Sequence, residues 1–231
     1  MSDNAETVPA AEPDGRATRW NDHKAQRRER ILQAAIDAIN ESGSDVGVQQ
    51  IAERANLPRS VVYRVFTGRS DLDEQIRARI IDMLMADLVP VLTPEGSIDD
   101  SITRAVDTYM RWIVEVPRLH QFLGTGSATR RTTGSRVVTG TKTAIAVQLT
   151  GLFETLLRGL DKGTQLAESL AFGVIGLVDV SVNRWLSNSQ SALSIEELAD
   201  FLTVSIWQVI DGNLRTIGAV LDPATPISEL L

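Results

Sequence analysis

The stretch Val48-Gln-Gln-Ile-Ala-Glu-Arg-Ala-Asn-Leu-Pro-Arg-Ser-Val-Val-Tyr-Arg-Val-Phe66 decides the fold. Its pattern predicts two short helices, one over residues 48–55 and one over 58–66, joined by a turn at Asn56. Asn tolerates the positive φ of a tight turn, and Pro58 suits the first turn of a helix. Val62 and Phe66 lie four residues apart and therefore share one face of the second helix. Two short helices and a tight turn form the layout of a helix-turn-helix.

Further helices are predicted on both sides of this motif. Before it, apolar residues with a helical period predict a helix over 23–42, begun by Asp22 and ended by Gly43. After it, Ser70 and Asp71 favour the start of a helix over 71–89, which we expect to stop at Pro90. The first three helices then form one compact unit.

The remaining sequence also has helical periodicity. It predicts helices over 97–116, 117–123, 141–160, 166–186 and 194–217, with Ser97 as an N-cap and Ser194 with Glu197 as a capping box. The segment 124–140 is rich in Gly, Ser and Thr, and we expect a loop there. No segment shows the sustained period-2 alternation of a strand. The predicted fold class is all-α.

Composition excludes several kinds of chemistry. The chain has 231 residues, 43% of them hydrophobic, which suits one or two globular domains. It has no cysteine, so disulfides and thiolate metal sites are excluded. His23 and His120 are far apart in sequence, and no GxSxG motif or phosphate-binding loop is present. We therefore predict no enzyme, no metal site and no cofactor.

The charge is unevenly distributed. Residues 1–15 carry four acids and no base, and we expect a disordered acidic tail there. The tail lacks the features of a signal peptide, and the chain contains no run of 18 apolar residues, so the expected location is cytoplasmic. The formal net charge is −7, yet residues 16–79 carry a net +3. A mildly basic unit suits a phosphate backbone, although ordinary variation of surface charge is the alternative.

The outward face of the second short helix carries the candidate DNA contacts. In a helix-turn-helix this helix enters the major groove with its N-terminal residues at the base edges. Arginine pairs with a guanine edge or a phosphate, and hydroxyl groups bind phosphate oxygens. The candidates are Arg59, Ser60, Tyr63 and Arg64, with Arg69 at a backbone phosphate. Arg16, Arg19 and Lys24 form either a minor-groove arm or a solvated tail.

This ordered set of motifs resembles the tetracycline-repressor (TetR) family of transcriptional regulators. The matching segments are Ile31-Leu-Gln-Ala-Ala35, Ile51-Ala-Glu-Arg-Ala-Asn56, Val62-Tyr-Arg-Val-Phe66 and Arg69-Ser-Asp-Leu72. The resemblance implies a phosphate contact for Tyr63, a phosphate contact for Arg69 in place of the usual lysine, and a backbone contact for Gln49. Three positions depart from the family pattern: Val46 replaces a capping threonine, Asn56 a glycine, and Val65 a histidine.

The resemblance also implies a domain plan. It places a helix-turn-helix DNA-binding domain with its N-terminal arm at 16–70 and a larger helical ligand-binding and dimerisation domain at 71–231. The last two long helices are apolar on more than one face, which suits a homodimer. Large apolar and intrahelical polar residues are candidates for lining a ligand pocket: Tyr109, Met110, Trp112, Ile113, Phe122, Phe153, Phe172, Ile175, Asp179 and Asn183.

The expected function is that of a dimeric repressor that binds a palindromic double-stranded DNA operator and responds to a small apolar or amphipathic effector, without a membrane partner. The alternative is an all-helical module that binds a small molecule or a protein without specific DNA binding. Salt-dependent DNA binding distinguishes the two.

Overall fold

The computed structural model describes the backbone of residues 15–93, 95–128, 136–188 and 193–230, and their side chains outside 15–22 and 125–144. These residues form α-helices and two short 3₁₀ turns, which agrees with the predicted all-α class. The helices are α1 (Gly15–Ser42), α2 (Val48–Arg54), α3 (Arg59–Val65), α4 (Arg69–Val91), α5 (Ile98–Glu115), α6 (Pro117–Ala128), α7 (Arg136–Gly159), α8 (Ala167–Ser187) and α9 (Ile195–Thr216).

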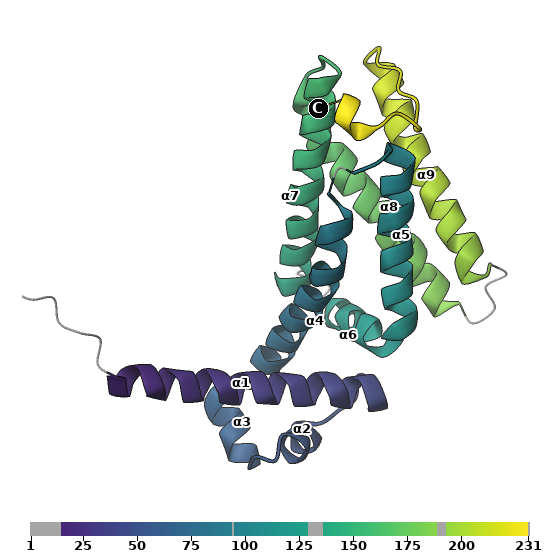
Figure 1. The fold of residues 1–231 in the computed structure, drawn as a ribbon. Coiled ribbons are helices and arrows are strands. Elements are labelled where there is room, and N and C mark those ends of the chain that lie inside the picture. Colours follow the sequence, from purple (N-terminus) through teal and green to yellow (C-terminus); the bar gives the residue numbers. More distant parts are fainter. Residues whose placement is uncertain (1–14, 94, 129–135, 189–192, 231) are drawn as a thin grey trace, which may run out of the picture.

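The first three helices form a small head (Figure 1). Helix α1 crosses the base of the molecule, with α2 and α3 on one side of it and the rest of the chain on the other. The head is closed by fully buried apolar side chains, among them Ile31, Ile39, Ile51 and Phe66. The turn between α2 and α3 contains Asn56 at φ 50°, the left-handed conformation that the sequence predicts there.

The other helices form an elongated body. Helix α4 starts in the head and continues into the body, where α5, α7, α8 and α9 stand beside one another (Figure 1). Helix α6 lies at the junction and contacts α1, α4 and α5. Ser97 caps α5, and Ser194 with Glu197 forms the predicted capping box of α9. At the far end, the C-terminal segment is held by a bond from Ile227 N–H to the Gly96 carbonyl, 2.8 Å.

Several predicted helix boundaries were wrong. Helix α1 begins at Gly15 and not after Asp22, so the proposed arm with Arg16, Arg19 and Lys24 is helical. Pro90 lies inside the last turn of α4, which ends one residue later at Val91, so the proline stops the helix just after the expected position. Residues 124–128 and 136–140 are helical, whereas 129–135 lie outside the described residues. The expected disordered tail also lies outside them, except for Gly15.

The expected domain boundary at residue 70 falls in the first turn of α4. Because α4 is continuous, the head and the body are joined by a rigid element rather than by a linker.

One segment, Thr164–Ser187, is long and apolar enough to cross a membrane by length and composition alone; 28% of its most apolar part is buried in the fold. Among the described side chains, no group of three His, Cys, Asp or Glu residues could hold a metal ion.

Candidate nucleic-acid interface and ligand cavity

Helix α3 has one buried and one exposed face. Val62 and the following Phe66 are each 1% exposed and anchor the helix to the head. Arg59, Ser60 and Arg64 are exposed, and Tyr63 is 45% exposed. The 3.6-residue period that buries Val62 therefore turns all four predicted contact residues of α3 toward solvent. A DNA groove lying against this face could contact all four side chains at once.

Arg59 and Tyr63 form a pair on this face. The guanidinium of Arg59 donates to the Tyr63 hydroxyl at 3.1 Å and lies 5.3 Å from the centre of its ring. Residues four apart on a helix are neighbours, so this contact is local and holds both polar ends at the start of α3. The Arg59 fork still has other N–H groups with which to bind a base edge or a phosphate.

Gln49 lies on the exposed side of α2, where its amide donates to the Glu53 carboxylate at 2.7 Å. Helix α2 is tied to α1 by Arg54, which bonds Glu41 and lies 3.9 Å from Asp37. The Arg54 hydrogen bond also holds the pKa of Glu41 below its usual value. This exposed ion pair adds a contact between α1 and α2 to the buried apolar side chains that hold them together, such as Ile39 and Ile51.

Arg69 has a structural contact that the sequence did not indicate. Its Nη1 donates to the Val46 carbonyl at 2.6 Å, and its Nε to Asp73 at 2.7 Å. The side chain is 36% exposed. It therefore connects the start of α4 with the loop before α2, 23 residues earlier in the chain. A phosphate contact at Arg69 would use only the part of the guanidinium that these bonds leave open.

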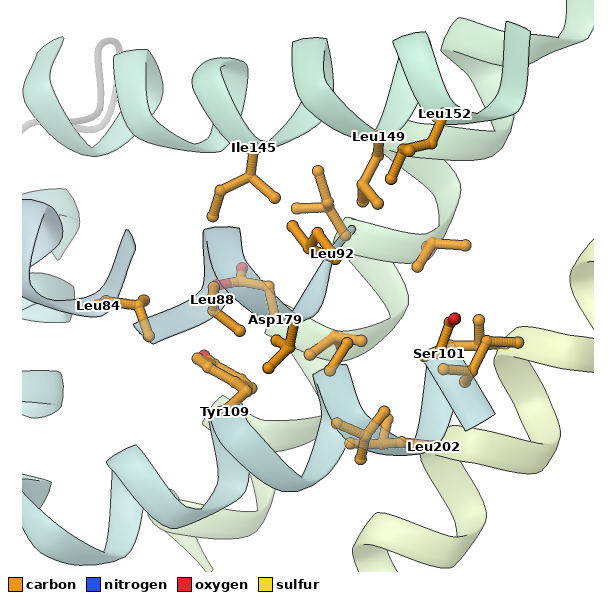
Figure 2. Close-up of a pocket in the computed structure, with 18 of the residues that line it drawn as sticks. Leu84, Leu88, Leu92, Ser101, Tyr109, Ile145, Leu149, Leu152, Asp179 and Leu202 are labelled. Carbon is orange, nitrogen blue, oxygen red and sulfur yellow. The ribbon is translucent and has the colours of Figure 1, made fainter. Parts of the chain in front are cut away.

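The body contains a partly open cavity of about 960 Å³. Its walls come from α4, α5, α6, α7, α8 and α9, and most of them are aliphatic, as Figure 2 shows for Leu84, Leu88, Leu149 and Leu202. A volume of this size lies at the upper end of the range that holds drug-sized ligands. The only formally charged residue among its described lining residues is Asp179.

Five of the ten predicted pocket residues line this cavity: Tyr109, Phe153, Ile175, Asp179 and Asn183. Four others, Met110, Trp112, Ile113 and Phe122, are buried in the core and are not among the lining residues. Phe172 is 46% exposed on the outer side of α8. The sequence identified helices with two apolar faces but could not tell which face the neighbouring helix would occupy.

Two hydrogen-bonded polar pairs line the cavity. Tyr109 and His120 share a hydrogen bond of 3.2 Å, and Asn183 donates to the Asp179 carboxylate at 3.1 Å. Figure 2 shows Tyr109 and Asp179 on the same side, with Ser101 on the other. Burial, and then the charge of Asp179, raise the pKa of Tyr109 far above its usual value, so its hydroxyl stays neutral.

Sequence reasoning missed His120, which lies 7% exposed at the cavity wall. It also missed the aliphatic wall of α7, including Ile145, Leu149 and Leu152. The three-, four- and seven-residue spacing along this helix was a usable signal, but the same spacing is equally typical of a helix packed against a neighbour.

Comparison with known proteins gives a consistent picture of the fold, although no family model matches the chain. A relative from Mycobacterium tuberculosis, described as an uncharacterized HTH-type transcriptional regulator, is 24% identical over 219 residues, covering 94% of this chain and 92% of the relative. A TetR-family transcriptional regulator from Streptomyces coelicolor superposes with a TM-score of 0.67 at 20% identity, covering 83% of each chain. A TetR transcriptional regulator from Rhodococcus sp. RHA1 gives 0.60 at 16% identity, covering 81% of this chain and 97% of that one.

These likenesses extend over head and body together, and not only over the motif that suggested them. The structure therefore confirms the expected resemblance at the level of architecture: this chain has the fold of the TetR-family transcriptional regulators.

Proposed function

We propose that the chain is a ligand-responsive transcriptional regulator that binds operator DNA through α3 as a cytoplasmic homodimer. The observation that carries this proposal is the outward face of α3, where Arg59, Ser60, Tyr63 and Arg64 stand together while Val62 fixes the helix to the head. An exposed helix with two arginines and two hydroxyl groups suits a major groove, whose edges and phosphates accept hydrogen bonds.

The roles of two residues on this face can be separated by experiment. Arg59 stands at the N-terminus of α3, where base contacts are made, whereas Tyr63 lies one turn later. Arg59→Ala should weaken binding by about 1–3 kcal/mol at a specific base pair and relax the preference there. Tyr63→Phe should instead weaken binding by about the same factor for every DNA sequence.

The test is DNA-binding anisotropy on the preferred duplex and on single-base variants of it. A suitable control is Arg158→Gln, which removes an exposed arginine from the body at the far end of α7. Equal losses on all duplexes for Arg59→Ala and Tyr63→Phe would remove base reading from Arg59. No loss for either variant would favour a helical module without specific DNA binding.

The outer faces of α8 and α9 support the homodimer. Exposed apolar side chains lie there at helical spacing, with Phe172 and Val180 on α8 and Phe201 and Val204 on α9. The same sides carry glycines at 173, 176 and 212, where an added Cβ would meet nothing within 4 Å. Small residues beside apolar ones allow two helices to approach closely, and a symmetric partner would cover both faces at once.

A dimer also explains why α8 is so apolar while much of it is unburied. In the dimer, Phe201→Glu would place a charge either opposite the same position of the partner subunit or beside another apolar side chain. We expect this variant to run as a monomer in sedimentation and to lose operator binding, because each half-site alone is bound weakly. A dimer that persists in Phe201→Glu and in Val180→Glu would contradict this interface.

The cavity supports a response to a small apolar or amphipathic effector. Helix α6 contributes His120 and Gln121 to its wall, and the same helix reaches the head through Arg118, which donates to the backbone carbonyls of Asn40, at 3.1 Å, and Glu41. A molecule seated in the cavity would press on α6 and α4, both of which contact α1. Differential binding to two positions of the heads would then shift their population.

The cavity can be tested with Nile red, an apolar dye that becomes fluorescent in apolar sites. Leu149→Lys places a charge on the aliphatic wall, and Val147→Lys, on the exposed side of the same helix, is the matched control. We expect one dye per protomer for the unmodified chain and for Val147→Lys, and at least tenfold weaker binding for Leu149→Lys. Equal binding by both variants would place the dye elsewhere.

A further inference from the structure

The N-terminal part of α1 extends beyond the other helices of the head. Figure 1 shows it projecting beyond α3 on the side of the molecule opposite α9. Residues 23–26 are exposed, and farther along α1 the Arg28 guanidinium lies 5.4 Å from the centre of the Phe66 ring and Glu29 pairs with Arg79 at 3.0 Å.

The projecting part has a basic face. Arg16, Arg19, His23, Arg27 and Arg30 follow one another at intervals of three, four, four and three residues, so these positions share one face of α1. Asp22 and Glu29 fall on a different side. Residues 15–27 carry Arg16, Arg19, Lys24 and Arg27 against Asp22 alone, a net charge of +3.

The helical register places these positions on the side of α1 that faces the helix-turn-helix. Asp37 and Glu41 lie seven and eleven residues after Arg30 and so continue the same face, and these two acids contact Arg54 of α2. The basic positions therefore fall on the side of α1 that holds α2. In Figure 1 the projecting end also points away from α8 and α9, the faces assigned above to the partner subunit.

We propose that residues 15–30 of α1 form a second DNA-contacting element that lies along the phosphate backbone outside each half-site. This inference rests on the proposed DNA-binding function. Thirteen helical residues from Gly15 to Arg27 span about 20 Å at 1.5 Å per residue. At 3.4 Å per base pair they reach about six base pairs beyond the half-site, and contacts to phosphates carry no sequence preference.

The test combines protein variants with DNA length. The variant R16Q/R19Q/R27Q removes three positive charges from the basic face, and R158Q/K162Q/R215Q removes three from the far end of the body as a matched control. Each protein is titrated against the core palindrome alone and against the palindrome with six further base pairs on either side, from about 50 to 200 mM salt.

The unmodified chain and the control should bind the longer duplex at least tenfold more tightly, whatever the added sequence. R16Q/R19Q/R27Q should bind both duplexes equally, and the slope of log K against log salt should fall by up to about 5, since six phosphate contacts per dimer contribute ~0.9 each. It should keep its preference for the core palindrome. Equal effects of the added base pairs on all three proteins would overturn the inference and leave α3 as the DNA-binding element. Absence of any preference by the unmodified chain would overturn the proposed function as well.

Discussion

Arg69 offers a sharp test of how the head is held together. The TetR resemblance implies a phosphate contact there, whereas the structure places Arg69 between the Val46 carbonyl and the Asp73 carboxylate. A hydrogen bond from a charged donor contributes about 1.5–3 kcal/mol, and an ion pair four residues apart on a helix about 0.3–0.5 kcal/mol. Because the side chain is 36% exposed, the lower end of this range applies, and Arg69→Ala should cost about 2 kcal/mol.

For a chain of this length, about 2 kcal/mol corresponds to a fall in melting temperature of roughly 4–8 °C. Thermal unfolding followed by circular dichroism measures it, and hydrogen exchange should show faster opening of the loop at residues 43–47. The matched control is Arg64→Ala, an exposed arginine on α3, which should change the melting temperature by less than about 2 °C. If Arg69→Ala keeps the melting temperature of the unmodified chain and only weakens DNA binding, the structural role is refuted.

Three other perturbations have definite expected outcomes. Asn56 has φ 50°, so Asn56→Ala should cost about 1 kcal/mol while Asn56→Gly costs almost nothing; equal melting temperatures for the two variants would contradict this. The backbone N–H of Thr67 holds the pKa of Asp71 below its usual value, so the stability contributed by the carboxylate is present at neutral pH and is lost as the pH falls through that lowered pKa. The advantage of the unmodified chain over Asp71→Asn in urea unfolding should therefore shrink from pH 7 to pH 3, and a constant difference would disprove the assignment. Arg118→Gln should speed hydrogen exchange at the end of α1 by about tenfold, through loss of the bonds to Asn40 and Glu41, whereas Arg111→Gln on the exposed side of α5 should not; equal exchange in both variants would remove Arg118 from the junction.

Local rules predicted the helix-turn-helix and the start of α9 well because their signals are local. The turn at Asn56, the buried pair Val62 and Phe66, and the capping box at Ser194 each depend on residues within four positions. The start of α1 was predicted wrongly because a capping residue such as Asp22 can also lie inside a helix. The spacing of residues does not indicate whether the helix starts at Gly15 or after Asp22.

Long-range contacts could not be predicted in the same way. The bond from Arg69 to Val46 spans 23 residues, and the bond between Tyr109 and His120 depends on how α5 meets α6. For the pocket, the sequence named Phe172 and Phe153 on equal grounds, yet one is exposed on α8 and the other lines the cavity. Apolar periodicity indicates that a face is covered, and only the packing of helices decides what covers it.

The central claim is that this chain binds specific DNA through α3, and fluorescence anisotropy tests it most directly. The probe is the intergenic DNA beside the gene of this protein, with a random duplex of equal length as the reference, from about 50 to 200 mM salt. We expect tighter binding to the intergenic DNA, a steep loss of affinity with salt, and weaker binding by Arg59→Ala. Equal affinity for both duplexes, unchanged by Arg59→Ala and Tyr63→Phe, would contradict the account.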